Sequence, residues 1–287
     1  MQFHKGIKEI SANYDYLIFD LWGVIHDGVK AYSGVVEALS YLRSQGKKIC
    51  FLSNAPRRSY KVAEVLKKFS ISEDFYEFIL TSGEATFLDF KKNQENNFSE
   101  FGQKYFYIGP QKDIDLLDGL NYQRVSEVSK ASFAIATGFD DEKSILQEKL
   151  PQIQEAKKYN LPLICVNPDL LVVRQNGDEM ICAGVLAAEY EKMGGEVLYY
   201  GKPFPSVYEM TYSFFGKPDK RKIIAIGDGM ETDIKGAVDF GIDSVLITGG
   251  ILCNKLGIRY GEEVAHDKVQ QICESYKIFP KYVINKL

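Results

Sequence analysis

The chain has 287 residues, of which 45% are hydrophobic and 26% charged, a composition typical of a globular protein with one large domain or two smaller ones. Its formal net charge of -4 and its scattered lysines and arginines offer no basic surface for a phosphate backbone, so no nucleic acid partner is expected. No apolar run approaches the roughly 20 residues of a membrane span, and the N-terminus lacks the apolar segment of a signal peptide. We therefore expect a soluble cytoplasmic protein without a membrane partner.

Cysteines and histidines do not suggest a metal centre or a histidine-based active site. The five cysteines form an odd, widely spaced set without a Cys-x-x-Cys pair, which argues against a disulfide framework and a zinc site. The three histidines are also far apart, so a Ser-His-Asp triad is not expected.

Apolar runs alternate with segments of helical spacing along the chain. Runs at 16–19, 48–52 and 79–81 are separated by helical patterns at 35–42 and 60–69, which is the rhythm of parallel βαβ units. The middle third has apolar runs of its own, and the last third resumes the pattern. We therefore predict an α/β fold built on a Rossmann-like parallel sheet.

Three polar residues stand where apolar runs end: Asp20, Ser53 and Asp228. In open α/β sheets the ligand site lies outside the carboxyl ends of the strands, so one sheet carrying all three would bring them together. About 175 residues separate Ser53 from Asp228. The economical interpretation is an α/β cap inserted into the core, with core residues 1–82, cap residues 83–195 and returning core residues 196–287.

These residues suit the chemistry of phosphoryl transfer. An aspartate can attack phosphorus only if the phosphoryl oxygens are neutralised, for which a divalent cation and a lysine are the usual means. Asp20, Asp228 and Asp233 offer the hard oxygen ligands that suit Mg²⁺. Lys202, between Gly201 and Pro203, can supply the second positive charge, and Ser53-Asn54 offers a hydroxyl and backbone N–H groups.

Four ordered motifs resemble those of the haloacid dehalogenase (HAD) superfamily: Asp20-x-x-Gly-Val, Leu52-Ser53-Asn54, Gly201-Lys202-Pro203 and Gly227-Asp228-(x4)-Asp233. The long gap between the second and third motifs resembles the large-cap class IIA, NagD-like branch. Further similarities to that branch lie in the inserted region, including Gly138-Phe139-Asp140 and Asn167-Pro168-Asp169.

The resemblance implies a role for each of these residues. Asp20 would be the nucleophile that forms an aspartyl-phosphate, with Ser53 and Lys202 holding the phosphoryl oxygens. Mg²⁺ would be bound by Asp20, Asp228 and the main-chain carbonyl of Trp22, while Asp233 would either bind it or orient Lys202. Substrate contacts from the core and cap are expected at Ser53, Asn54, Lys202, Asn167 and Asp169. The expected ligand is a small phosphorylated metabolite, and a homodimer is compatible with the sequence.

The sequence departs from the family pattern at residue 22. Phosphatases of this family carry an aspartate two positions after the nucleophile as general acid and base, whereas here the residue is Trp22. An indole N–H can donate a hydrogen bond but cannot exchange a proton at ordinary pH. Because general acid–base catalysis typically contributes about 10² to 10⁴ in rate, an uncompensated loss predicts a slow phosphatase.

Three explanations of this departure stay open. The protein is a phosphatase for esters with a good leaving group, or one in which the substrate, His26 or Asp27 acts as the acid. Alternatively it is a binding or regulatory protein with little turnover. In the third, it cleaves carbon–halogen bonds, although that reaction needs no Mg²⁺ and does not account for Asp228 and Asp233.

Overall fold

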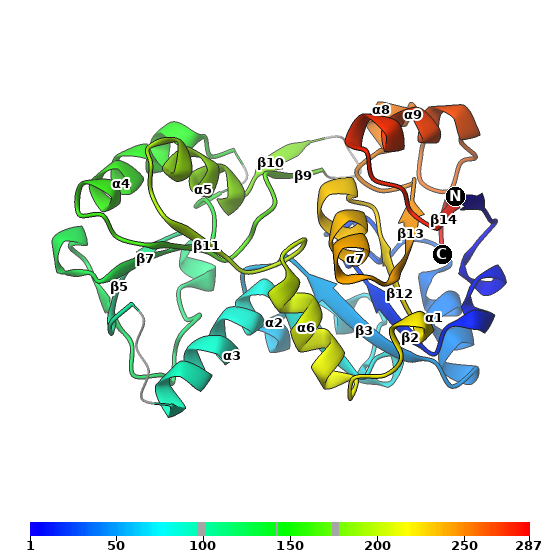
Figure 1. Ribbon diagram of the computed structural model, residues 1–287, viewed down its shortest axis with the longest axis horizontal. Helices are drawn as coiled ribbons and strands as arrows, with labels where there is room; N and C mark the ends of the chain where they lie inside the picture. The colour runs from blue at the N-terminus through cyan, green and yellow to red at the C-terminus, as the bar shows by residue number, and fades with distance from the viewer. Residues whose placement is uncertain (97–100, 142, 174–177) are drawn as a thin grey trace.

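The computed structural model describes residues 1–96, 101–141, 143–173 and 178–287. Their strands form a seven-stranded sheet, a five-stranded sheet and a separate two-stranded pair. Figure 1 shows the two larger sheets in different lobes, with both chain termini in the lobe of the seven-stranded sheet. The predicted α/β fold with a parallel Rossmann-like core is therefore confirmed.

The seven-stranded sheet is parallel, in the order β1-β14-β13-β12-β2-β3-β4. Its inner strands are buried on both faces, which explains why they are continuous apolar runs instead of alternating patterns. The strands are β1 (Gln2–Phe3), β2 (Tyr16–Phe19), β3 (Lys48–Ser53), β4 (Phe78–Thr81), β12 (Ile223–Gly227), β13 (Asp243–Ile247) and β14 (Tyr282–Ile284).

Helices cover both faces of this sheet. Helices α1 (Val35–Ser44) and α2 (Ser59–Lys68) pack on the face that includes Leu17 and Phe19. Helices α6 (Pro205–Phe214) and α7 (Lys235–Phe240) pack on the opposite face, against side chains such as Ile18 and Leu52. Near the β14 edge lie α8 (Cys253–Leu256) and α9 (His266–Tyr276). The alternation of Leu17, Ile18 and Phe19 between the two faces is the ordinary period of a strand.

The second sheet is parallel and has the order β11-β8-β7-β5-β6. Helices α4 (Leu146–Lys158) and α5 (Ala183–Lys192) pack against its central strands, and α3 (Ser82–Glu95) leads from β4 toward it (Figure 1). The strands are β5 (Lys104–Ile108), β6 (Gln123–Val125), β7 (Phe133–Ala136), β8 (Leu163–Cys165) and β11 (Val197–Tyr199).

The position of β11 differs from the sequence expectation. The ranges predicted above place residues 197–199 in the returning core segment, but β11 pairs with β8 in the second sheet. A short apolar run before a glycine loop reads the same in either sheet, so the sequence does not reveal which sheet it joins. The inserted segment thus extends past residue 195, and the chain returns to the first sheet only after β11.

A two-stranded antiparallel pair lies between the two lobes in Figure 1. It consists of β9 (Leu171–Val173) and β10 (Glu179–Ile181), with Val172 opposite Met180. Nothing in the sequence predicted it, since each strand has only three residues. Within the ranges that the structure describes, no helix is long and apolar enough to cross a membrane.

Candidate active site

Strand pairing brings the two predicted acidic motifs together. Strand β12 lies beside β2, with Ile226 opposite Phe19, although about 200 residues separate them in sequence. The backbone N–H of Asp20 donates to the carbonyl of Ile226 at 2.9 Å, so Asp20 and Asp228 leave the sheet side by side. Ser53 is the last residue of β3, the neighbouring strand on the other side of β2. The carboxyl edge of the sheet therefore gathers all three strand-end residues.

Lys202 joins the nucleophile candidate to the last motif. Its Nζ donates to Oδ1 of Asp20 at 2.5 Å and to Oδ1 of Asp233 at 2.7 Å. The other oxygen of Asp233 accepts from the backbone N–H of Gly229 at 3.0 Å. Lys202 is only 4% exposed, so both ion pairs are formed away from bulk water. Since both oxygens of Asp233 are engaged, the geometry favours its role in orienting Lys202.

The three carboxylates form a compact oxygen cluster. Ligand atoms of Asp20, Asp228 and Asp233 lie within 4.8 Å of one another. Backbone approaches Asp228 from two sides, because a Cβ added to Gly23 or to Gly250 would lie 1.9 Å from its Oδ2. Gly23 also has a φ of +85°, which a side chain would strain. The glycine of Asp20-x-x-Gly thus lets the loop after β2 close on the second acid.

Burial and mutual repulsion govern the ionisation of this cluster. Burial is the main cause that raises the pKa of Asp20 to about 7; Lys202 opposes the rise and Asp233 adds to it. Burial also raises the pKa of Asp228 well above its ordinary value, and the charges of Asp20 and Asp233 raise it further. Burial by itself lowers the pKa of Lys202, but the same carboxylates outweigh it and raise that pKa. Three carboxylates face one ammonium, so the donor set and its charge fit a hard divalent cation.

Asn54 connects this edge of the core to the cap. Its amide nitrogen donates to Oδ1 of Asp169 at 2.8 Å and to the carbonyl of Lys202 at 3.1 Å. Its amide oxygen accepts from the backbone N–H of Lys202 at 2.7 Å. Asn167 in turn accepts from the backbone N–H of Asp169 at 3.0 Å, which fixes the turn before β9. Burial raises the pKa of Asp169 to about 6, although the bond from Asn54 lowers it.

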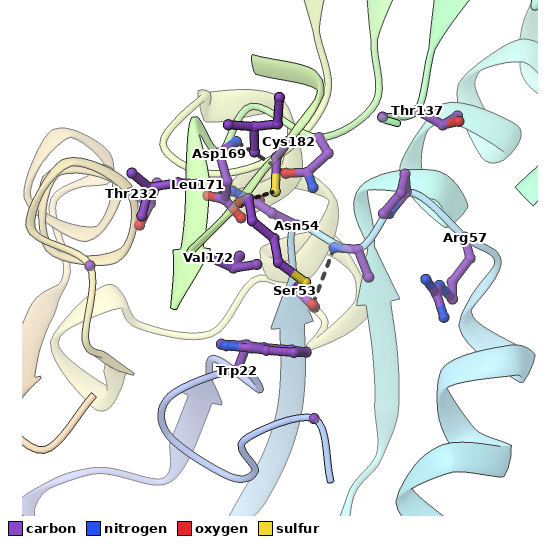
Figure 2. Close-up of a pocket in the computed structure, with 18 of the residues that line it drawn as sticks. Trp22, Ser53, Asn54, Arg57, Thr137, Asp169, Leu171, Val172, Cys182 and Thr232 are labelled. Carbon is purple, nitrogen blue, oxygen red and sulfur yellow. Dashed lines mark hydrogen bonds between the residues drawn. The ribbon is translucent and has the colours of Figure 1, made fainter. Parts of the chain in front are cut away.

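A cavity of about 430 Å³ lies between the carboxyl edge of the core sheet and the cap. Its lining includes every site residue that the sequence predicted, namely Asp20, Trp22, Ser53, Asn54, Asn167, Asp169, Lys202, Asp228 and Asp233. Figure 2 shows Ser53 at the tip of its strand, with Trp22 on one side of it and Asn54 and Asp169 on the other. These residues therefore share one cavity, and the roles given to them stay predictions.

The two alternative acids, His26 and Asp27, are not among the residues that line the cavity. Nδ1 of His26 accepts from the backbone N–H of Gly28 at 3.0 Å, and burial lowers the pKa of this histidine to about 4. Oδ1 of Asp27 accepts from the backbone N–H groups of Val29 and Lys30 at 2.8 and 2.7 Å. Both side chains therefore shape the loop that carries Trp22, which argues against either as the proton donor.

The two adjacent arginines after the Leu52-Ser53-Asn54 motif, Arg57 and Arg58, have different surroundings. Arg58 forms two hydrogen bonds with Glu84, at 2.8 and 3.1 Å, and lies 3.3 Å from the ring centroid of Phe87, so it serves the packing of α3. Arg57 lines the cavity, where its Nε lies 3.5 Å from the buried Oδ1 of Asp113 in the cap. Burial raises the pKa of Asp113, and Arg57 opposes that rise.

Sequence reasoning missed the apolar part of the lining. Leu171, Val172, Met180 and Ile181 from the β9–β10 pair border the cavity, together with Phe139. Three-residue strands give too little periodicity to detect, and the facing of a cap element toward the core depends on the packing of two lobes. No local signal in the sequence would have identified these side chains.

Comparisons with known proteins identify relatives of the chain. Two family models match: haloacid dehalogenase-like hydrolase over residues 17–123 and HAD-hydrolase-like over residues 199–277. A sugar-phosphatase, AraL, of Bacillus subtilis is 28% identical over 82% of this chain and 83% of its own length. Phosphoglycolate phosphatase 2 of Arabidopsis thaliana is 26% identical over 92% of each chain.

The fold is also that of a solved structure. A hydrolase of the haloacid dehalogenase-like family from Brucella suis superposes with a TM-score of 0.81, at 29% identity and over 99% of both chains. The two matched segments include all four ordered motifs. The chain therefore belongs to the haloacid dehalogenase superfamily of hydrolases, in the class IIA branch that its motif order resembles.

Proposed function

We propose that the protein hydrolyses small phosphate monoesters in a Mg²⁺-dependent reaction through an aspartyl-phosphate on Asp20. The chain is a HAD-like phosphomonoester hydrolase by its family and by its phosphatase relatives. The single observation that supports this mechanism most strongly is the buried group in which Lys202 contacts both Asp20 and Asp233, with Asp228 alongside. Such a group combines a nucleophile with positive charge for the phosphoryl oxygens.

Binding of the phosphoryl group would use the edge of the core sheet. Ser53 offers its hydroxyl, and Lys202 offers an ammonium group whose raised pKa keeps it charged. Lys202 already holds Oδ1 of Asp20, which leaves Oδ2 as the attacking oxygen. As the bond from Oδ2 to phosphorus forms, the bond from phosphorus to the ester oxygen breaks and its electron pair leaves with that oxygen.

Asp20, Asp228 and the main-chain carbonyl of Trp22 would hold the Mg²⁺. The bound cation supplies positive charge that offsets the repulsion between the phosphoryl group and the carboxylates. Asp233 supports the site through Lys202, because its two oxygens are taken by Lys202 and by the backbone of residue 229. Gly23 and Gly250 keep the space around Asp228 narrow enough to hold its carboxylate in one orientation.

The aspartyl-phosphate would then be hydrolysed by water. The family's usual base for this step is absent at residue 22, and His26 and Asp27 are engaged by their own loop. This observation favours a second candidate function, a weakly catalytic protein that binds a phosphorylated ligand. Carbon–halogen cleavage gains no support, because the Asp228 and Asp233 cluster is complete.

Phosphate release from a panel of monoesters tests the proposal. The relatives' names suggest sugar phosphates and phosphoglycolate as members of the panel, each assayed with and without Mg²⁺. We expect Mg²⁺-dependent release that Asp20→Asn reduces by roughly 10³-fold or more, because it removes the nucleophile. Release that persists in Asp20→Asn would refute the aspartyl-phosphate. If the native protein releases no phosphate while Trp22→Asp does, the binding function is favoured.

The substrate is expected to be a small phosphorylated metabolite. The chain's cytoplasmic location and a homodimer stay predictions. Fractionation of the source cells and light scattering of the purified protein test them.

A further inference from the structure

The indole of Trp22 forms a rigid apolar wall beside the nucleophile. It stands two residues after Asp20 and lines the same cavity. The ring lies against Gly28, where an added Cβ would be 2.4 Å from its Cη2. Its other support is His26, whose ring meets the indole edge to face at a centroid distance of 5.8 Å and an interplanar angle of 76°. The wall is thus held by its own loop and needs no ligand to form.

The β9–β10 pair supplies a second apolar wall from the cap. Leu171, Val172 and Met180 line the cavity that Trp22 lines from the core. In Figure 2, Leu171 and Val172 lie on one side of Ser53 and the flat face of Trp22 lies on the other. A leaving group attached to a phosphoryl group near Ser53 would therefore enter between an indole and aliphatic side chains. Such a slot suits a flat, apolar group.

The carboxylates in the described lining of this cavity already have partners. Asp20, Asp228 and Asp233 belong to the nucleophile and cation cluster. Of the other carboxylates that the structure describes in the lining, Asp169 is bonded to Asn54 and Asp113 is paired with Arg57.

Asp141, the remaining carboxylate of the described lining, accepts a hydrogen bond from the backbone N–H of Lys143 at 2.8 Å and is solvent-exposed. With no acid at residue 22 and with these carboxylates engaged elsewhere, we expect a departing oxygen to leave as an anion. An aryloxide does this readily, since a phenol has a pKa of about 10. An aliphatic alkoxide, whose conjugate acid is about as weak as water at roughly 15.7, does not.

We propose that Trp22 and the β9–β10 pair restrict this site to phosphate monoesters whose leaving group is flat, apolar and weakly basic, of which aryl phosphates are the simplest class. The proposal rests on the function proposed above. In the selected reaction Oδ2 of Asp20 bonds to phosphorus while the bond from phosphorus to the aryl oxygen breaks. The electron pair leaves on that oxygen as an aryloxide, which takes a proton from water after release. The absence of an acid at residue 22 is then part of how the site selects its substrates.

A leaving-group series tests the proposal. Phosphate release with Mg²⁺ is measured for substituted phenyl phosphates and for glycerol and ethyl phosphates, and kcat/KM is plotted against the pKa of the leaving group. We expect the native protein to show a steep decline, with alkyl esters at least 10²-fold slower than aryl esters. Trp22→Asp is expected to flatten the plot by raising the alkyl rates by roughly 10² to 10⁴, the usual contribution of a general acid.

Substitutions in the β9–β10 pair test the second apolar wall. Val172→Asp should raise KM for aryl esters by at least tenfold, and by more than it raises KM for alkyl esters, because it puts a charge into the apolar slot. Leu170→Asp is the matched control: Leu170 is the adjacent residue, is 55% exposed and does not line the cavity, so neither class of ester should be affected. Trp22→Phe, which keeps an aromatic wall without an acid, should keep the steep decline even where Trp22→Asp fails to fold.

The outcomes separate this proposal from the one on which it rests. Equal rates for alkyl and aryl esters, dependent on Asp20, overturn the selection and leave the phosphatase function intact. An unchanged KM for aryl esters in Val172→Asp overturns the apolar slot. Absence of release from every ester, in the native protein and in Trp22→Asp alike, overturns the proposed function and the selection with it.

Discussion

Asp228 illustrates how a residue suited to binding a cation can weaken the fold. It is buried, and its raised pKa means that its charged form is disfavoured by burial and by Asp20 and Asp233. A carboxyl group whose pKa is raised above its unfolded value of about 3.9 binds more protons in the native state. Its charge therefore destabilises the fold once the pH rises above that unfolded value. A bound cation reverses the effect, since it favours the charged form.

Replacement of Asp228 should show both effects. At pH 8 without metal, Asp228→Asn is expected to have a higher free energy of unfolding than the native protein, because the buried charge is gone. Mg²⁺ at 100 times its Kd should stabilise the native protein by about 2.7 kcal/mol and the variant hardly at all. Urea unfolding with and without Mg²⁺ measures the difference. Asp239→Asn, at an exposed helix position, is the control and should keep the full response to Mg²⁺. An equal response in Asp228→Asn would contradict the metal assignment.

At the scale of elements, predictability depended on burial and length. The strands that end at Asp20, Ser53 and Asp228 were predictable, because parallel strands buried on both faces leave continuous apolar runs. The sheet to which β11 belongs and the existence of the β9–β10 pair were not predictable. Both involve strands of three residues, and the sheet that β11 joins depends on its pairing with residues of β8 that are distant in sequence.

The bond between Asn54 and Asp169 is a contact of this kind, because 115 residues separate the two side chains. It links the loop after β3 in the core to the turn before β9 in the cap, and Asn54 also holds the backbone of Lys202 at both its N–H and its carbonyl. The resemblance to family motifs identified Asn54, Asp169 and Lys202, but only the fold shows that hydrogen bonds connect them. The cap is therefore connected to the loop that carries Lys202.

Loss of this link should weaken substrate binding. Asp169→Ala removes a hydrogen bond to a charged group, which typically contributes about 1.5 to 3 kcal/mol, so KM is expected to rise by roughly tenfold or more. Asp169→Asn keeps an acceptor for the Asn54 amide and should recover part of the loss. Steady-state kinetics on the best monoester of the panel measure both variants. Asp118→Ala, at an exposed position in the cap, is the control. A KM in Asp169→Ala equal to that of the control would show that the link does not assist binding.

At the scale of the whole molecule, the two lobes contribute different parts of the site. Lys202 and the cluster of Asp20, Asp228 and Asp233 come from the core, and the cap contributes Asn167, Asp169 and the apolar wall. The three carboxylates are buried, and burial is the leading cause of the raised pKa values of Asp20 and Asp228. We therefore expect activity to depend on pH and on the cation.

This coupling predicts that Mg²⁺ moves the acid limb of the pH profile. Only charged Asp20 can attack phosphorus, and burial raises its pKa to about 7, so kcat/KM should fall as the pH drops through that region at low Mg²⁺. Protons and Mg²⁺ compete for the same carboxylates, so more Mg²⁺ should move the limb to lower pH, by up to about one unit for each tenfold increase until the site is saturated. Profiles of kcat/KM at several Mg²⁺ concentrations measure the shift, with Asp228→Asn expected to lose it. A limb that stays at one pH at every Mg²⁺ concentration would mean that the group that titrates is not part of the cation site.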